Sequence, residues 1–253
     1  MAEHSGVVIC STKTGQFKTI RLGSSEVRKL VLDPLAGYLF FLIAQARDKP
    51  RLGKTRDFSY SYMYWTGIDG QNLERIGVWR SEMDGAKSSL LVQRFHVKIE
   101  PDMSMDHASR LLFWVENTTP FRGEELWEVL RSDLAGRTVS RTIQLRRQPL
   151  GIQVAENTLF WTTSGANGIM SCEKGTGNNL IKHPLRDFND RATGFLIIKP
   201  PSYYQVGKNA CATGGLCSHM CIPTPSGYMK CLCPRGCKLL PDGWNCGTEP
   251  TRL

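Results

Sequence analysis

The sequence predicts an all-β protein, a series of repeated antiparallel sheets followed by a small disulfide-rich module. Apolar residues seldom recur at the spacing of a helix, and short β-rich runs alternate with Gly, Asp and Asn turns. A pair of aromatic residues recurs with the same lead-in along the first two hundred residues. Seven of the nine cysteines lie between Cys211 and Cys246, so a separate unit is expected at the end of the chain.

The composition is that of a globular chain. Of 253 residues, 41% are hydrophobic and 22% are charged, which is enough apolar material to bury a core. The net charge of +9 would suit an anionic partner, but the basic residues are scattered. The densest cluster, which lacks the interleaved aromatic residues of a single-strand binder, is Arg137, Arg141, Arg146 and Arg147. We therefore expect no nucleic-acid partner.

Neither a membrane span nor a leader peptide is visible. The longest apolar stretch, residues 39–44, is far shorter than the roughly 20 residues that a bilayer-spanning helix needs. The first residues lack a basic start, a sustained apolar region and a small-residue cleavage site. We expect no direct membrane insertion by this chain.

Four aromatic boxes mark the repeat. Each holds two adjacent aromatic residues, and an Asp or Gln stands seven positions ahead of the first: Phe40 and Phe41 after Asp33, Tyr64 and Trp65 after Asp57, Phe113 and Trp114 after Asp106, Phe160 and Trp161 after Gln153. This register favours core and inter-sheet packing over a recognition surface for these side chains.

A second strand follows three of the boxes and ends in a hairpin turn. Its glycine supplies the positive φ that a tight turn needs, at Gly85, Gly136 and Gly175. Outer strands are expected directly afterwards, at 88–92, 139–145 and 179–183. Gly85 and Gly136 are 51 residues apart, and Gly136 and Gly177 are 41 apart, which is typical of four-stranded propeller blades.

The boxes resemble degenerate copies of the Tyr-Trp-Thr-Asp repeat of the low-density lipoprotein receptor family, in which a β-propeller is followed by an epidermal-growth-factor-like (EGF-like) module. The resemblance implies a propeller over residues 1–206. We count four blade-equivalents of an expected six-bladed ring, of which three are complete and one closes from 7–20 and 195–199. At least one blade is expected upstream, so the chain is interpreted as a fragment.

Two departures from the family pattern matter. The boxed aspartate, which braces neighbouring blades in the family, is replaced here by Ile43, Gly67, Glu116 and Thr163. We therefore expect little bracing between blades, and stability that depends on the aromatic residues. In addition, residues 46–61 are interpreted as either a loop inserted within one blade or the join left by a deletion. A solvated insertion is favoured.

The C-terminal cysteines lie in a segment too short and too poor in apolar residues to fold by burial alone. Zinc or disulfides would serve as cross-links, but Cys231-x-Cys233 is too tight for a zinc knuckle. Spacing alone leaves 15 pairings open for six cysteines. The segment resembles an EGF-like module at 207–247, followed by a tail at 248–253, and this resemblance implies the pairs Cys211–Cys221, Cys217–Cys231 and Cys233–Cys246.

Three cysteines remain outside that set. Cys237 is interpreted as a free thiol, an intermolecular bridge or a variant that disturbs local packing, whereas Cys10 and Cys172 are expected to be buried thiols. Dense disulfides indicate an oxidising compartment, and Asn117 begins a glycosylation sequon. The chain is therefore placed on the extracellular side of a single-pass membrane protein, at the cell surface or in the endosome.

The sequence offers little catalytic chemistry. We expect no cofactor, no metal site and no catalytic residue, because the five histidines have no partner at metal-ligand spacing. The acidic residues that a propeller hydrolase would need are expected at surface turns and strand ends instead: Glu100, Asp102, Asp106 and Glu116. His107 and His183 lie in or beside blade turns and are the candidates for an acid-sensitive switch.

The resemblance implies a non-catalytic, ligand-binding region of a lipoprotein-receptor-like endocytic receptor, with the propeller promoting ligand release in acidic endosomes. Its partners would be a secreted protein or lipoprotein and the other modules of the parent receptor; the sequence does not identify the ligand-binding residues. Three alternatives stay open: a Wnt-coreceptor-like ectodomain, a basement-membrane linker, and a propeller hydrolase with metal ligands in its channel.

Overall fold

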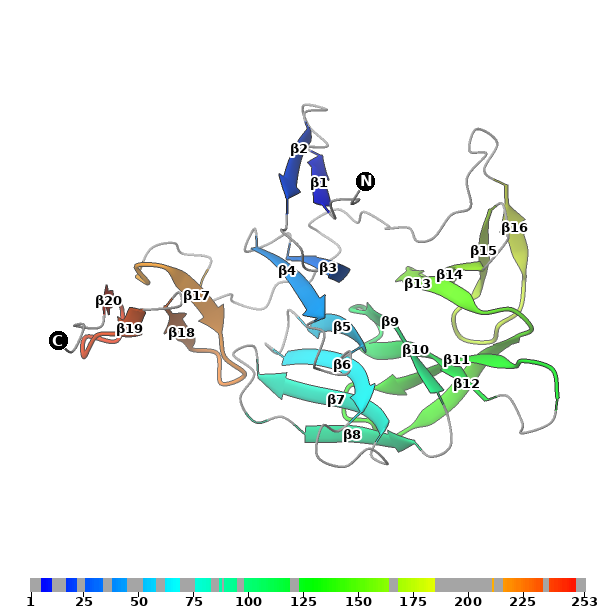
Figure 1. Ribbon diagram of the computed structural model, residues 1–253. Helices are drawn as coiled ribbons and strands as arrows, with labels where there is room; N and C mark the ends of the chain where they lie inside the picture. The colour runs from blue at the N-terminus through cyan, green and yellow to red at the C-terminus, as the bar shows by residue number, and fades with distance from the viewer. Residues whose placement is uncertain are drawn as a thin grey trace.

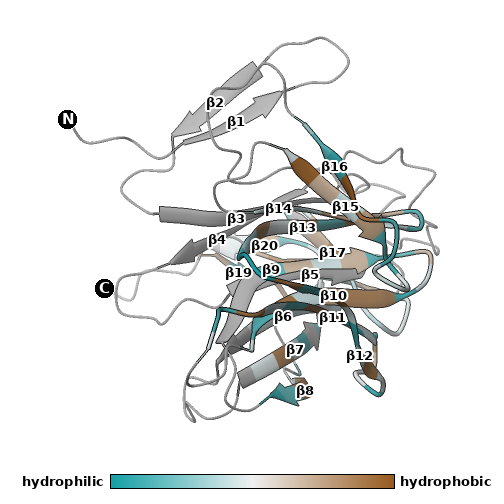
Figure 2. Cartoon of the chain, turned by 90° about the vertical axis from the view of Figure 1, so that its right-hand side faces the viewer, coloured by the Kyte–Doolittle hydropathy of each residue, from teal (hydrophilic) through white to brown (hydrophobic). Residues whose placement is uncertain are grey.

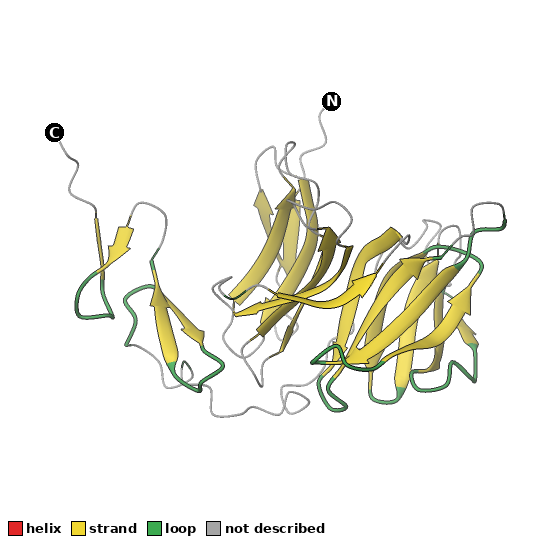
Figure 3. Ribbon diagram, turned by 90° about the horizontal axis from the view of Figure 1, so that it is seen from below, coloured by secondary structure: helices red, strands yellow, loops and turns green. Residues whose placement is uncertain are grey.

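The computed structural model is all-β, as predicted, and consists of consecutive antiparallel sheets followed by two small hairpins (Figure 1). It describes residues 6–10, 17–21, 26–33, 38–44, 52–57, 62–68, 76–82, 87, 89–94, 98–118, 123–163, 168–184, 211, 216–233 and 237–248. Within these residues the chain forms strands and turns and no helix (Figure 3).

Three sheets have four strands each, in chain order. Sheet I contains β5 (Leu52–Asp57), β6 (Tyr62–Ile68), β7 (Ile76–Glu82) and β8 (Ser89–Arg94). Sheet II contains β9 (Lys98–Asp106), β10 (Leu111–Asn117), β11 (Trp127–Asp133) and β12 (Val139–Leu145). Sheet III contains β13 (Pro149–Ala155), β14 (Thr158–Thr163), β15 (Ile169–Glu173) and β16 (Ile181–His183). Each is an up-and-down meander, the architecture of a propeller blade.

The other described sheets have two strands each. Two of them precede sheet I: β1 (Gly6–Cys10) with β2 (Phe17–Arg21), and β3 (Glu26–Asp33) with β4 (Tyr38–Ala44). Two follow sheet III: β17 (Met220–Pro223) with β18 (Met229–Leu232), and β19 (Cys237–Leu239) with β20 (Cys246–Thr248). The expected closing strand at 195–199 lies outside the described residues.

The preference for a solvated insertion at 46–61 is wrong. Residues Leu52–Asp57 within it form β5, the first strand of sheet I, and pair with β6 from Leu52 opposite Thr66 to Asp57 opposite Tyr62. The basic residues Lys54 and Arg56 had favoured a solvated loop for this segment. Asp57 instead ends β5 at the place where Asp106 ends β9, so the segment is the start of a new sheet.

Sheet II is buried on both faces because sheets I and III pack against it. Along β10 the side chains alternate: Leu112 and Trp114 join the apolar cluster shared with sheet I, whereas Phe113 and Val115 join the cluster shared with sheet III. All four are completely buried. Strand periodicity therefore explains why both faces of β10 are apolar, and the apolar part of β10 is correspondingly brown in Figure 2.

Two glycines in hairpin turns allow the backbones of neighbouring sheets to approach closely, one between sheets I and II and one between sheets II and III. Gly136, with φ of 71°, follows β11, and a Cβ atom there would lie 2.7 Å from the Leu91 carbonyl oxygen of sheet I. Gly177, with φ of 74°, follows β15 and approaches the Thr142 carbonyl of sheet II in the same way. At Gly175, the expected turn glycine, a Cβ atom would come no nearer than 4.0 Å to another atom, so Gly177 is the counterpart of Gly136.

Candidate functional site

Glu116 links sheets I and II. It stands near the end of β10, is completely buried, and accepts hydrogen bonds from Arg94 Nε at 2.9 Å to each carboxylate oxygen and from Trp114 Nε1 at 2.7 Å. Arg94 Nη2 lies 2.8 Å from Oε2, which completes a two-pronged ion pair with β8. The expectation of a surface position for Glu116 is therefore wrong, and the box position does brace neighbouring sheets.

The first strand of sheet II links it to sheet III. Alternate residues of β9 face β13: an Asp102 carboxylate oxygen accepts a hydrogen bond from the Ile152 amide, and Ser104 Oγ accepts one from the Val154 amide at 3.1 Å. Both acceptors bind main-chain donors, so the position of β13 relative to β9 is set by backbone groups. Asp102 is thus a bracing residue, half-buried between the sheets.

Asp106 and Lys174 form a second buried ion pair, between sheets II and III. Asp106 is completely buried, not at the surface as expected. Lys174 Nζ also donates to Ser109 Oγ at 2.9 Å and to the Glu156 carbonyl at 2.6 Å. Burial alone would raise the pKa of Asp106, but hydrogen bonds from Lys174 and Ser109, and the Lys174 charge, outweigh it and hold the pKa below its usual 3.8.

The main chain at Lys174 is fixed as well. Arg131 Nη1 donates to its carbonyl oxygen at 2.8 Å, and Thr142 Oγ1 donates to the same oxygen at 3.2 Å. The turn after β15 is therefore tied to β11 and β12 of sheet II. Side-chain and main-chain contacts together connect the adjoining turns of sheets II and III.

Sequence reasoning missed Arg94, Arg131 and Lys174. Glu116 carried a usable signal, because an acidic residue two positions after a box tryptophan lies on the same face of the strand. Lys174 carried none, since its partners Glu156 and Asp106 are 18 and 68 positions away in the chain.

The two candidate histidines lie on different sheets. His183 is exposed on β16; its Nε2 lies 2.8 Å from Ser171 Oγ, and its ring is 6.3 Å from the Phe160 ring, centroid to centroid. His107 is half-buried in the turn after β9, directly after Asp106. The structure does not bring them into one cluster, and each stands beside a contact that stabilises a sheet.

The box aromatics within the described side chains are mostly internal. Tyr64, Phe113, Trp114 and Trp161 are at most 1% exposed, and Phe160 is half-buried. The side chains of Phe40, Phe41 and Trp65 lie outside the described part. Asn117, the sequon asparagine, is half-buried at the end of β10, opposite Trp127.

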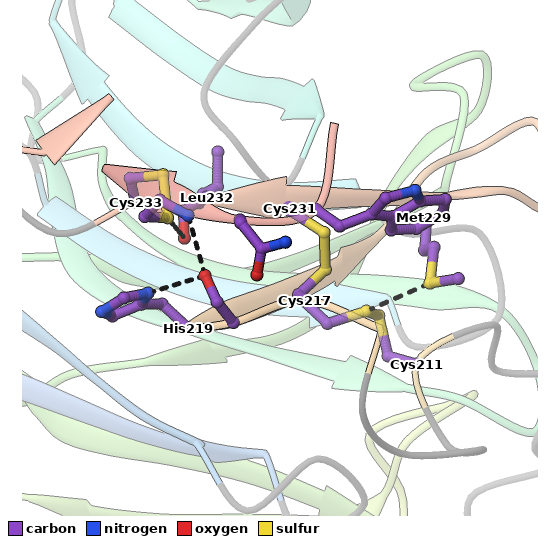
Figure 4. Close-up of a disulfide and its surroundings, with 12 residues drawn as sticks. Cys211, Cys217, His219, Met229, Cys231, Leu232 and Cys233 are labelled. Carbon is purple, nitrogen blue, oxygen red and sulfur yellow. Dashed lines mark hydrogen bonds between the residues drawn. A yellow bond between two sulfur atoms is a disulfide. The ribbon is translucent and has the colours of Figure 1, made fainter. Parts of the chain in front are cut away.

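The C-terminal unit is held by three disulfides. Cys211 is bonded to Cys221, Cys217 to Cys231 and Cys233 to Cys246, with Cα atoms 5.7, 5.4 and 5.6 Å apart. Figure 4 shows the Cys217–Cys231 bridge, with Cys211 and Cys233 of the other two bridges beside it.

Ser218 joins the two hairpins of this unit. Its amide donates to the Trp244 carbonyl at 3.0 Å, and its hydroxyl accepts from the Cys246 amide at 2.9 Å. The same hydroxyl lies 2.9 Å from His219 Nδ1, the contact drawn at His219 in Figure 4. The β17–β18 and β19–β20 hairpins are thus connected by hydrogen bonds as well as by sulfur.

The remaining cysteines differ in environment. Cys237 is half-buried and has no disulfide. Cys172 is 2% exposed in the apolar cluster between sheets II and III, where burial and then the negative charge of Glu173 raise the pKa of its thiol to about 11. The side chain of Cys10 lies outside the described part.

The described residues contain neither a metal-binding cluster nor a membrane-spanning helix. No three His, Cys, Asp or Glu side chains among them gather closely enough to hold a metal ion. No helix in that same part of the chain is long and apolar enough to cross a membrane.

Curated relatives of this chain are large receptors. Low-density lipoprotein receptor-related protein 4 of Homo sapiens is 29% identical over 150 residues, which is 58% of this chain and 7% of that protein. Low-density lipoprotein receptor-related protein 5 of Mus musculus is 27% identical over 208 residues, 81% of this chain and 12% of that protein. Vitellogenin receptor Yl of Drosophila melanogaster is 27% identical over 191 residues, 73% of this chain and 9% of that protein.

The chain therefore spans only a small part of the relatives it matches. No protein-family model matches it. Among solved structures, a nidogen/laminin complex is similar with a TM-score of 0.42 and 18% identity, covering 60% of this chain and 56% of that one. An oligogalacturonate lyase with manganese also has a TM-score of 0.42, at 11% identity, covering 71% and 59%. Likeness at this level carries no functional argument.

Proposed function

We propose, since this chain belongs to the low-density lipoprotein receptor family, that it is a non-catalytic, extracellular ligand-binding region of an endocytic receptor. The observation that carries the proposal is the combination, in one chain, of stacked sheets locked by buried ion pairs and a unit closed by three disulfides. We place the boundary between the propeller and the EGF-like module at 206/207, with a tail from 248.

The sheet contacts support binding because they hold the turns in place. Lys174 and Arg131 connect turns from sheets II and III before any ligand arrives. A preorganised surface loses little conformational entropy on association. The disulfides support an extracellular location, since such bridges persist in oxidising compartments.

The ligand we propose is a lipid-carrying protein of the lipoprotein or yolk type. The relatives named above include low-density lipoprotein receptor-related proteins and a vitellogenin receptor. For this chain the partner's chemistry follows only from that relationship, together with the other modules of a parent receptor.

Release in acid would act through histidines and not through the buried carboxylate. The pKa of Asp106 lies below 3.8, so its ion pair with Lys174 stays intact at the mild acidity of an endosome. The candidates are His183 and His107, because histidine is the residue type that most often serves as a pH sensor in proteins. A charge on either would arise beside a contact that supports a sheet.

The test is a binding measurement on the secreted chain with its disulfides intact. Purified low-density lipoprotein and purified vitellogenin are the probes, at about pH 7.4 and about pH 5.5. We expect saturable binding of at least one probe at the higher pH and loss at the lower. His183→Ala and His107→Ala together should preserve neutral binding and weaken the acid loss, with His219→Ala as the matched control.

Failure to bind either probe would overturn the proposed ligand class. Binding of a Wnt protein or of laminin in the same assay would favour the coreceptor-like or the basement-membrane alternative. One tightly held divalent ion per purified chain, together with ester or lactone hydrolysis, would overturn the non-catalytic proposal.

A further inference from the structure

Asn117 begins the motif that the glycosylating enzyme of the secretory pathway recognises. This motif is an asparagine, then any residue except proline, then Ser or Thr, and residues 117–119 read Asn-Thr-Thr. No other asparagine of the chain has a Ser or Thr two positions after it. The sequence therefore offers one position for an N-linked glycan, and the structure decides whether a glycan fits there.

Asn117 lies at the point of β10 where burial ends. Residues 112–116 of this strand are all buried, whereas Asn117, its last residue, is half-buried. The side chain is on the same face of the strand as Phe113 and Val115, but two residues beyond the last of them, toward the end of the sheet. One position earlier, at Glu116, a sugar would have no room. At Asn117 it can leave the sheet.

The connection that follows β10 is hydrated and polar. Its base is closed by a hydrogen bond from the Thr118 amide to the Leu126 carbonyl at 2.9 Å. Among the described residues of this connection, 123–125 are exposed. Arg146 Nη1 lies 3.7 Å from Glu124 Oε2, and these side chains are 85% and 80% exposed. So exposed an ion pair contributes little to stability, and this surface can accommodate a bulky polar group.

The disulfides of the C-terminal unit indicate the compartment in which such a glycan is added. Three bridges in one small unit form and persist in the secretory pathway and outside the cell. Asparagine-linked sugars are surface modifications of secreted proteins. Two features from different parts of the chain therefore agree. The inference rests on the extracellular location given under the proposed function, and not on the identity of the ligand.

We propose that Asn117 carries an N-linked glycan, which projects into solvent from the end of sheet II. In the transfer, Nδ2 of Asn117 bonds to the anomeric carbon of the first sugar of a lipid-linked oligosaccharide diphosphate. The bond from that carbon to the phosphate oxygen breaks, and the lipid diphosphate leaves with the proton that Nδ2 loses. The bulky, hydrophilic product keeps this end of the sheet facing solvent.

The first experiment reads the modification at Asn117 directly. The chain is secreted from mammalian cells and treated with peptide-N-glycosidase F, which converts a glycosylated asparagine to aspartate. Peptide mass spectrometry should find aspartate at position 117 in most chains, and asparagine there in a Thr119→Ala variant. Asn157→Gln is the matched control, because Asn157 is exposed in a turn but has Leu159 two positions after it, and should leave the glycan in place.

An unmodified Asn117 in the secreted, unsubstituted chain would overturn the proposal. This readout needs no variant, so it decides the matter even if Thr119→Ala is not secreted. A glycan still present in Thr119→Ala would equally contradict the assignment to this motif.

A second measurement tests whether the glycan faces solvent. Processing enzymes of the Golgi trim only sugars that they can reach, and the trimmed product resists endoglycosidase H. We expect the glycan of the folded, secreted chain to be resistant, whereas a sensitive glycan would contradict the solvent-facing position. A glycosylated chain that binds neither lipoprotein nor vitellogenin would keep this proposal and overturn only the proposed ligand class.

Discussion

The contact between sheets I and II and the contact between sheets II and III bury different polar groups, with different hydrogen-bond partners. Both bury aliphatic and aromatic side chains, with Trp114 in one and Trp161 in the other. The first contact includes a carboxylate enclosed at one end of β10, paired with Arg94. In the second contact, β9 side chains accept hydrogen bonds from main-chain amides of sheet III. Lys174, in the turn after β15, forms an ion pair with Asp106 at the end of β9.

This difference shows that bracing does not depend on one position of the repeat. Glu116 keeps an acidic group at the family's aspartate position, whereas Thr163 does not. Sheet III is nevertheless held by residues from another strand and from a turn. Degenerate boxes are therefore compatible with closely packed sheets, provided that each interface has some set of satisfied buried polar groups.

The largest expected effect is from Glu116→Leu at the first contact. Arg94 and the Trp114 indole N–H would lose their buried acceptor, which should lower the free energy of unfolding by about 3–5 kcal/mol. Urea unfolding measures it. Glu128→Gln is the control, because its partner Arg141 is more than half exposed, and should cost less than about 1 kcal/mol. Equal losses would contradict the role of burial.

Gly136→Ala should have the next largest effect. The position has φ of 71° and its new Cβ would lie 2.7 Å from the Leu91 carbonyl oxygen, so strain and overlap together should cost about 2–4 kcal/mol. Gly175→Ala, where the nearest atom is 4.0 Å away, should change stability by less than about 0.5 kcal/mol. The measurement is the thermal unfolding of both variants. If Gly136→Ala were as stable as Gly175→Ala, sheets I and II would not be in close contact at this turn.

Lys174→Met tests the second contact and should cost about 2 kcal/mol at neutral pH, less than the loss of Glu116, because Asp106 retains other donors. The lowered pKa of Asp106 means that its stabilising contribution is present above the unfolded value and is lost as the pH falls through the folded value. The difference between the two proteins should therefore be constant from about pH 7 to pH 5 and shrink below about pH 4. Urea midpoints across this range are the measurement; a difference that vanishes already at pH 5 would contradict it.

The smallest effect concerns Cys172, within the second contact. With a pKa of about 11 its thiol is almost entirely protonated at neutral pH, so iodoacetamide should not modify it in the native chain. Peptide mass spectrometry before and after unfolding in urea provides the comparison. Modification of native Cys172 at the rate seen in urea would show that sheets II and III separate readily.

The sequence predicted the features that depend on local pattern. The outer strand at 139–145 was placed by the hairpin turn at Gly136, and the burial of Phe113 and Trp114 was expected from the repeat of the boxes. The constant spacing of seven between the lead-in residue and the box does not mark equivalent strand ends, because the hairpins differ in length. The hairpin after β13 has two residues, at 156–157, whereas the hairpin after β9 has four, at 107–110. Ala155, not Gln153, is therefore the strand end equivalent to Asp106.

The polar contacts were harder to predict for a different reason. Lys54 and Arg56 read as a solvated loop because basic residues are usually exposed, although their strand is the first of sheet I. Lys174 joins groups that are far apart along the chain, and no periodic pattern links such residues. Only the assembled sheets bring them together.

The inert thiol of Cys172 bears on how the C-terminal module acquires its bridges. A thiolate is the species that attacks a disulfide, and a group that stays protonated withdraws from that reaction. Once sheets II and III have closed over this sulfur, it no longer competes for the partners of the module's six bonded cysteines. Correct oxidation near one end of the chain is thereby helped by tight side-chain packing well upstream of it.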